Sequence, residues 1–213
     1  MAGRVLVTAS IKGGVGKSTL VSCLASRWLQ AGKSVGLIDT DPNKTLTRWH
    51  EKGGALSKAT LRTELDEHAV SERIAELSDK NDLTLVDCAG FGNQAMIFAI
   101  GSAGLVLIPA MADEASIFEA LRTRKVVNNT SNIANREIPA RTVLVRVKRS
   151  SVANHARRQL ESLGAEPLDS QLADRIVFQE STFYGSAPTD TAPSSVAADE
   201  IRRLVEEIEA LKW

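Results

Sequence analysis

A glycine-rich segment close to the N-terminus constrains the fold of this chain more than any other feature. Residues 10–19 read Ser-Ile-Lys-Gly-Gly-Val-Gly-Lys-Ser-Thr, between an apolar run over 4–10 and a stretch of helical periodicity over 18–31. Glycines let a backbone curl so that successive N–H groups point inward and hold phosphate oxygens. A strand, a glycine loop and a helix N-terminus in this order predict a phosphate-binding loop.

Individual residues of this loop have predictable roles. Lys17 is expected to reach the β- and γ-phosphates of ATP, and the hydroxyl of Ser18 is expected to ligate Mg²⁺. The alternative is a glycine-rich turn with a chance lysine, which the flanking strand and helix disfavour. The remaining predicted contacts to the nucleotide come from Gly13, Gly14, Val15, Gly16 and Thr19.

A second lysine, Lys12, stands at the start of the loop, where an ordinary phosphate loop needs none. Ordinary loops receive an arginine from elsewhere, or from a partner, to stabilise charge on the transferred phosphoryl group. Lys12 cannot easily fold back onto the nucleotide of its own loop, but it could reach one bound by a facing, two-fold-related subunit. We therefore predict a catalytic role for Lys12 across a dimer; the alternative is a solvated surface charge.

Two apolar runs end in acidic residues. Residues 35–39 read Val-Gly-Leu-Ile-Asp and are followed closely by Asp41, and residues 83–87 read Leu-Thr-Leu-Val-Asp. Buried parallel strands have this composition, and their carboxyl ends open onto the ligand crevice. Carboxylates at that place hold Mg²⁺, usually through water, or orient and deprotonate an attacking water. Taken singly, each acid could instead cap a helix or form a turn.

The loop over residues 12–19 resembles the deviant Walker A box of the ParA/MinD superfamily, which includes plasmid-partition ATPases, the cell-division ATPase MinD and the nitrogenase iron protein. In that family the first lysine acts across an ATP-sandwich dimer, which implies this role for Lys12. The resemblance also implies that Asp41 positions the hydrolytic water. It further implies that Asp39 lies beside the magnesium and that Asp87 is the Walker B acid.

Two positions depart from the common pattern of the superfamily. Ser18 replaces threonine, which conserves the ligating hydroxyl, and Ala89-Gly90 stands in place of the commoner Pro-Pro of the nucleotide-sensing switch. The short chain and the segment 41–49 look most like the small ParF-type partition proteins. By the same resemblance, Arg146 ends a late strand that reaches the base, where a guanidinium could stack on adenine. The alternative is an exposed charge at a strand end.

The rest of the chain alternates between predicted strands and helices. This favours a single doubly wound, mostly parallel α/β domain over residues 1–213, with helices on both faces, and no DNA-binding extension before the first strand. Cys23 and Cys88 are expected to be reduced core thiols. The further expected strands are 60–63, 105–109 and 141–147, and the further expected helices are 45–52, 67–78, 93–103, 113–128, 151–163 and 195–212.

These residues predict an ATPase that converts ATP and water to ADP and phosphate, with weak basal activity. The resemblance implies a cytoplasmic protein that partitions plasmid or chromosomal DNA. In its ATP state it would form a homodimer and bind DNA non-specifically on the nucleoid, and a centromere-binding or cargo adaptor protein would stimulate hydrolysis. The formal net charge is zero, so bulk charge gives no support for DNA binding. Arg202 and Arg203 are the preferred DNA contacts, although solvated helix faces are the commoner explanation of such pairs.

Three alternative functions follow from the same sequence. The same ATPase mechanism could position a protein cluster or assist DNA transfer. A MinD-like membrane ATPase would need a basic amphipathic anchor, whereas residues 206–213 are short and acidic, so no membrane partner is expected. A P-loop small-molecule kinase is the alternative outside this class, but no substrate-pocket signal supports it.

Overall fold

A single seven-stranded sheet organises the molecule. The computed structural model describes residues 3–90 and 94–213, and the neighbouring strands in them pair in parallel. The strand order is β3-β2-β4-β1-β5-β6-β7, so β1 lies at the centre. The prediction of a doubly wound parallel fold is confirmed. The strands are β1 (Arg4–Thr8), β2 (Val35–Asp39), β3 (Thr60–Thr63), β4 (Leu83–Asp87), β5 (Leu105–Ala110), β6 (Ala140–Val147) and β7 (Pro167–Ala173).

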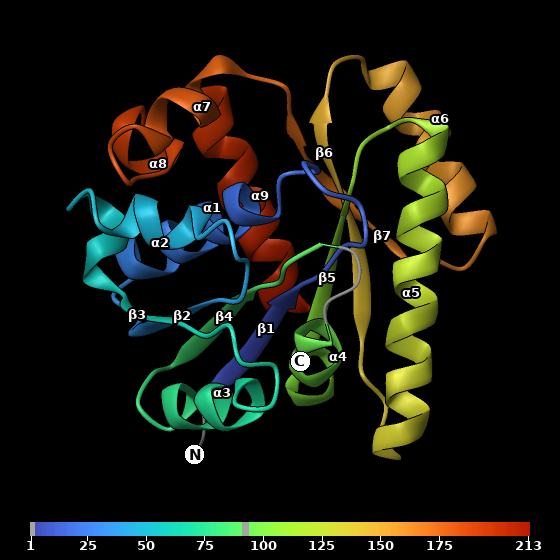
Figure 1. Cartoon of the computed structure of the whole chain (residues 1–213). Coiled ribbons are helices and arrows are strands. Elements are labelled where there is room, and N and C mark those ends of the chain that lie inside the picture. Colours follow the sequence, from blue (N-terminus) through green and yellow to red (C-terminus); the bar gives the residue numbers. More distant parts are fainter. Residues whose placement is uncertain (1–2, 91–93) are drawn as a thin grey trace.

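Helices cover both faces of this sheet (Figure 1). One face carries α1 (Lys17–Gln30), α2 (Thr45–His50), the 3-10 helix η1 (Ala55–Lys58), α7 (Ile176–Thr182), α8 (Pro188–Thr191) and α9 (Val196–Ala210). The other face carries α3 (Val70–Ser78), α4 (Ala95–Ser102), α5 (Glu114–Ala134) and α6 (Ser150–Ser162). Within the described part of the chain, none of these helices is both long enough and apolar enough to cross a bilayer.

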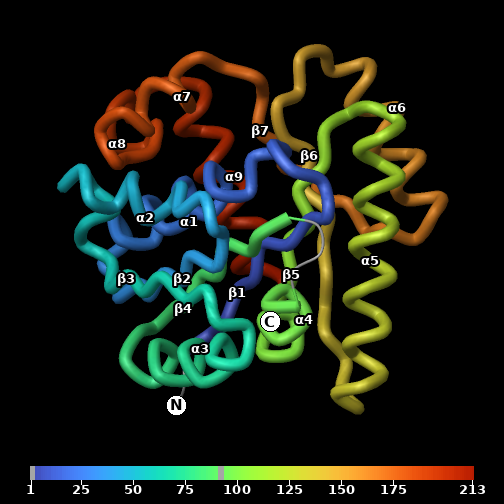
Figure 2. Tube along the Cα trace, viewed as in Figure 1, coloured from blue at the N-terminus to red at the C-terminus, as the bar shows by residue number. Residues whose placement is uncertain are grey.

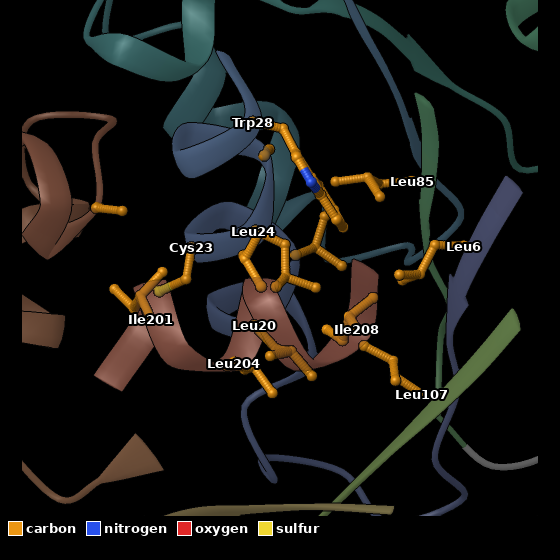
Figure 3. Packing of buried hydrophobic residues seen from close by; sticks show 14 of the residues in the cluster. Leu6, Leu20, Cys23, Leu24, Trp28, Leu85, Leu107, Ile201, Leu204 and Ile208 are labelled. Carbon is orange, nitrogen blue, oxygen red and sulfur yellow. The ribbon is translucent and has the colours of Figure 1, made fainter. Parts of the chain in front are cut away.

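The first and last long helices pack together on one face of the sheet (Figure 3). Leu24 and Trp28 of α1 and Leu204 and Ile208 of α9 are fully buried in one hydrophobic cluster. Burying each such side chain contributes roughly 1.5–3 kcal/mol. The indole of Trp28 also donates a hydrogen bond of 2.9 Å to Glu209 Oε1. Trp28→Ala would therefore be a costly single change for this face, at roughly 3–5 kcal/mol.

Successive residues of the central strands point to opposite faces, as a pleated strand requires. In β1, Leu6 belongs to the cluster beneath α1 and α9, whereas Val7 belongs to the cluster beneath α3, α4, α5 and α6. Every residue of β2, β4 and β5 is buried. This is why these strands read as continuous apolar runs rather than as alternating patterns.

The structure also contains elements that the sequence analysis does not assign. The expected strands and helices are all present, and β2, β3 and β4 have the expected ends. Other ends are shifted; α5, for example, continues to Ala134 instead of 128 and stops where Asn135 takes a left-handed φ of 49°. The helix expected over 93–103 begins at Ala95, and residue 93 lies outside the described residues. The sequence predicts no element between residues 164 and 194, but β7, α7 and α8 lie there.

Strand register brings the carboxyl ends of three strands to one level. Asp87 pairs with Thr8 of β1 on one side and with Asp39 of β2 on the other. Figure 2 shows that the loop after β1 also lies beside the ends of β6 and β7, and a hydrogen bond of 3.3 Å joins Arg146 Nη1 to the carbonyl oxygen of Gly14. The candidate site is therefore at this edge of the sheet, where ligands of open α/β folds bind.

Candidate functional site

The glycine loop between β1 and α1 takes a conformation that its glycines make possible. Gly14 has a φ of 70° and Gly16, the N-cap of α1, has a φ of 99°. Residues with a Cβ rarely adopt these angles, so both positions require glycine. The turn leaves the first N–H groups of α1 facing the loop without partners from its own helix, which is the arrangement that holds phosphate oxygens.

Lys17 is buried beside this loop. The whole residue is 6% exposed. Its ammonium group donates two long hydrogen bonds of 3.4 Å to the carbonyl oxygens of Ser10 and Lys12. No salt bridge to Lys17 occurs among the described residues. A buried cation without an ion-pair partner is costly, so this position favours an anionic ligand.

Asp39, at the end of β2, holds the following loop in place. Its Oδ2 accepts hydrogen bonds of 2.9 Å from both the backbone N–H and the hydroxyl of Thr47, and its Oδ1 accepts one of 3.1 Å from the N–H of Asp41. Asp41 in turn accepts a 2.8 Å bond from the N–H of Asn43, in an Asx turn. The β2–α2 loop is therefore fixed relative to the strand end.

Asp87, at the end of β4, has a different environment. It is 1% exposed and neither carboxylate oxygen has a hydrogen-bond partner among the described residues. The pKa of Asp87 is raised to about 7, mainly by burial and in part by the charges of Asp39 and Asp41, while Ser18 and Lys17 oppose the shift. A cation would relieve this cost. The carboxylate of Asp87 and the hydroxyl of Ser18 are hard oxygen ligands, so the residues present fit Mg²⁺.

Lys12 is engaged within its own subunit. Its ammonium lies 3.3 Å from Asp113 Oδ1, and its side chain is 25% exposed. Asp113 is the N-cap of α5, and its carboxylate also accepts a 2.8 Å hydrogen bond from the N–H of Ser116. The ammonium of Lys12 is therefore paired with Asp113 in this structure, whereas its backbone carbonyl oxygen accepts from Lys17.

A cavity of about 380 Å³ opens beside the glycine loop. We call its two sides the loop wall and the C-terminal wall. The loop wall comprises Gly14, Gly16, Thr19 and Leu20, with Trp49 from α2 nearby. The C-terminal wall comprises Val145, Arg146, Leu172, Ala173, Asp174, Arg175, Phe178, Gln179, Thr182 and Phe183.

The C-terminal wall is the part of the site that the sequence analysis largely misses. Arg146 is the one residue of this wall among the predicted site residues; it has a φ of 54° and reaches across to Gly14. The other residues come mainly from β7 and α7. The apolar pair Leu168 and Leu172, which are both buried, is the signal that could have indicated a strand there.

These features define a class of protein. A doubly wound parallel sheet carries a glycine loop at a helix N-terminus, a buried lysine without an ion-pair partner, and a buried acid without hydrogen bonds at the adjacent strand end, all within the described part of the chain. This is the site of a P-loop nucleotide-binding protein. Within that class, the chain is a member of the ParA/MinD superfamily of ATPases, as its loop predicted.

The chain belongs to the VirC1 family, whose family model, described as "VirC1 protein", matches residues 4–206. It is 32% identical to the protein virC1 of Rhizobium radiobacter over 170 residues, which cover 78% of this chain and 74% of that protein. It is also 26% identical to the protein ParA of the same organism over 184 residues, which cover 85% of this chain and 83% of that protein.

The fold is also similar to solved structures. The ATP complex of a variant of McdA from Cyanothece superimposes with a TM-score of 0.79 at 18% identity, over 99% of this chain and 97% of that one. At this identity the likeness concerns the fold. Resemblance to the ParF-type subgroup in particular stays a prediction.

Proposed function

We propose that this protein is a dimerising ATPase that partitions DNA or positions a cargo by cycles of ATP binding and hydrolysis. The observation that carries the proposal is that Lys17 and Asp87, both buried near the glycine loop, lack partners for their charges in the part of the chain that the structure describes. Among the described residues, the buried cation has no ion-pair partner and the buried acid accepts no hydrogen bond. ATP with Mg²⁺ supplies both missing partners, because phosphates meet the lysine and the metal meets the acid.

The chain's own residues then have distinct tasks. Backbone N–H groups of the loop and the ammonium of Lys17 bind the phosphates, and Ser18 and Asp87 would hold Mg²⁺. When bound, the metal neutralises charge that develops on the phosphates during transfer. Asp41 orients and deprotonates the attacking water, and Asp39 fixes the β2–α2 loop so that Asp41 stays in place. The products are ADP and phosphate.

Lys12 completes the site of a second subunit in this proposal. To cross the dimer interface it must leave Asp113, and an ion pair this exposed is worth only about 0–1 kcal/mol. The phosphates of a facing nucleotide offer more negative charge than one carboxylate, so ATP binding by both subunits favours the exchange. The homodimer is therefore expected in the ATP state.

Lys12→Ala tests the proposed function. The variant should keep most of the monomer's affinity for ATP but lose ATP-dependent dimerisation and hydrolysis, because the two nucleotides would face each other with less neutralisation. Sedimentation in saturating ATP measures the first loss, and phosphate release measures the second. The matched control is Lys33→Ala, an exposed lysine after α1 with no ion pair among the described residues. Normal dimerisation of Lys12→Ala would overturn the cross-subunit role.

Non-specific DNA binding is part of the same proposal. Arg203 lines a groove of about 420 Å³ together with Arg157, although Glu200 and Asp169 lie there too. Arg202 contacts Asp199 and the carbonyl oxygen of Pro193, which leaves Arg203 as the freer of the two predicted DNA contacts. Phosphate contacts from such arginines bind DNA without regard to sequence.

Replacing Arg202 and Arg203 together by alanine should weaken DNA binding in the ATP state and leave basal hydrolysis unchanged. Binding should also weaken steeply as salt is added. Arg62→Ala, an arginine on the opposite edge strand β3, is the control. Equal binding without nucleotide would contradict this part, and no DNA binding at all would favour a cargo-positioning role.

A centromere-binding or cargo adaptor protein is the proposed partner, acting on a nucleoid-associated dimer in the cytoplasm. The ParA relative supports partition among the uses of this mechanism. The same ATPase mechanism applied to a protein cluster or to DNA transfer remains the second candidate. A small-molecule kinase would transfer phosphate to an acceptor other than water, so equal yields of ADP and free phosphate would exclude it.

A further inference from the structure

Glu200 is a buried acid of α9 that connects this helix to the candidate nucleotide cavity. Its side chain is 10% exposed, and its two oxygens have different partners. Oε2 accepts a 3.1 Å hydrogen bond from the backbone N–H of Ala173 at the end of β7. Oε1 accepts two from the guanidinium of Arg175, at 3.2 Å from Nε and 2.7 Å from Nη2. Both partners belong to the C-terminal wall.

Arg175 is held at the wall of the cavity by these bonds. It is the N-cap residue of α7, its backbone does not continue the helix, and its side chain is 39% exposed. A long arginine side chain at such a boundary would otherwise sample many rotamers, at a cost of up to roughly 2 kcal/mol when it becomes ordered. Charge-assisted bonds to a buried carboxylate remove much of that freedom before any ligand arrives.

Within the described part of the chain, another glutamate of α9, Glu207, accepts hydrogen bonds from the backbone of β7 alone and serves as a comparison for Glu200. Glu207 accepts hydrogen bonds of 2.7 Å from the backbone N–H groups of Asp169 and Ser170, which are also in β7. Neither Glu207 nor these two residues line the cavity. The edge strand therefore already has one glutamate that satisfies its free N–H groups, and Glu200 differs from it by its additional bond to Arg175.

We propose that Glu200 is a positioning residue for nucleotide binding, which holds Arg175 so that its guanidinium contacts the nucleoside part of the nucleotide. This inference rests on the proposed function. The loop wall gathers phosphates at the N-terminus of α1, so the C-terminal wall is left for base and ribose. Leu172 and Phe178 give that wall an apolar surface, and a planar guanidinium stacks on an aromatic ring or donates to its edge.

A consequence is that nucleotide occupancy and the placement of α9 are coupled. Glu200 lies three residues before Arg203 on the same helix and also lines the groove that contains Arg203. A nucleotide that draws Arg175 toward its base pulls on the same carboxylate. Glu200 thus lines the groove that contains Arg203 and is hydrogen-bonded to Ala173 and Arg175 of the nucleotide cavity.

The experiment compares Arg175→Gln, Glu200→Gln, the double variant and the control Glu207→Gln. Calorimetric titration with Mg²⁺-ATP, and separately with Mg²⁺-tripolyphosphate, separates nucleoside contacts from phosphate contacts. Glutamine at position 200 can still accept from the N–H of Ala173 but no longer offers a charge to Arg175. We expect ATP to bind about tenfold more weakly to Arg175→Gln and about threefold more weakly to Glu200→Gln.

Three comparisons then support or overturn the proposal. Tripolyphosphate affinity should be unchanged in every variant, the double variant should bind ATP no more weakly than Arg175→Gln alone, and Glu207→Gln should bind ATP as the parent does. Equal losses for ATP and tripolyphosphate, additive losses in the double variant, or the same loss in Glu207→Gln would each overturn it. If the parent failed to bind ATP, the proposed function would fail as well, whereas normal binding by Arg175→Gln would remove only this inference.

Discussion

The two walls of the cavity differ in how they are made. The loop wall comes from one continuous segment, in which glycine at positions 14 and 16 is required by backbone angles and the neighbouring Lys17 by charge. The C-terminal wall is assembled from the ends of β6 and β7 and from α7, and apolar residues alternate in it with polar and charged ones. The residue types of the loop wall follow from backbone angles and charge, whereas the C-terminal wall depends on which strands and helices the fold brings together.

This difference follows from what each wall is proposed to bind. Phosphates carry concentrated charge and need donors at fixed places, so few residue types serve. A nucleoside offers a flat, largely apolar ring, and many side chains can cover it. Substitutions on the loop wall and at the adjoining acids should therefore have large effects, and substitutions on the C-terminal wall should have graded ones.

Lys17→Ala should have the largest effect and would sharpen the comparison most. Removing a buried charge that meets the phosphates should cost about 4 kcal/mol, or roughly a thousandfold in ATP affinity. Calorimetric titration with Mg²⁺-ATP measures the loss, and circular dichroism checks that the variant is folded. Near-parental affinity in a folded variant would remove the basis of the loop assignment.

Asp87→Asn should have the next largest effect, on stability rather than affinity. The pKa of Asp87 in the folded chain is about 7 because the group is buried, which is above the ordinary carboxyl value. The folded chain therefore binds more protons than the unfolded chain between about pH 4 and 7, so the unliganded parent loses stability as pH rises through this window. The stability of Asp87→Asn should not change over this window, and at pH 8 the variant should be more stable than the parent by about 3 kcal/mol.

Urea unfolding at pH 5, 6, 7 and 8 without nucleotide or metal checks this prediction. Asp82→Asn is the control, because bonds from Ser34 lower the pKa of Asp82 at the other end of β4. A constant difference between Asp87→Asn and the parent at every pH would contradict the assigned cause. In that case the cost of this buried acid would not come from its ionisation.

Asp41→Ala, in the β2–α2 loop, should have a smaller effect that separates chemistry from binding. ATP should still bind, whereas hydrolysis should fall about a hundredfold because the attacking water loses its base. Single-turnover phosphate release measures this, and sedimentation should show that the ATP-bound dimer accumulates. Parental turnover would move the role of the base to another acid.

Arg146→Ala should have the smallest effect, a loss of about threefold in ATP affinity. Its one hydrogen bond to the described residues, to the carbonyl oxygen of Gly14, is long at 3.3 Å, and the residue is exposed. Arg149→Ala, at the N-cap of α6 and outside the cavity lining, serves as its control. If Arg146→Ala lost as much ATP affinity as Lys17→Ala, the two walls would not differ as argued, because each would bind the nucleotide through a single essential charge.

The sequence predicts the loop wall well because its residues are fixed by local rules. Positive φ angles need glycine, and buried parallel strands need apolar runs such as 35–38 and 83–86, so β1, β2, β4 and α1 are recognisable without tertiary information. The acids at the strand ends follow from the same runs. Their different environments do not, because the bonds of Asp39 come from Asp41 and Thr47 in the folded β2–α2 segment, whereas Asp87 finds no such partners among the described residues.

The C-terminal wall is hard to predict because β7 is stabilised by distant residues. Its centre reads Asp-Ser-Gln, which has neither an apolar run nor a regular alternation. The N–H groups of Asp169 and Ser170 bond to Glu207, and the carbonyl oxygen of Asp169 accepts from Arg157. The strand exists because α6 and α9 satisfy its edge, and its local pattern is limited to the buried pair Leu168 and Leu172.

The central place of β1 has a consequence for the order in which the protein can fold during synthesis. Leu6 pairs with Leu85 on one side and with Leu105 on the other, so the first strand made lacks at least one neighbour until roughly 100 further residues have been added. At roughly 5–20 residues per second, a ribosome needs about 5–20 s for that length. Throughout this interval an apolar strand has at least one unpaired edge, and unpaired strand edges make partly folded chains prone to aggregation.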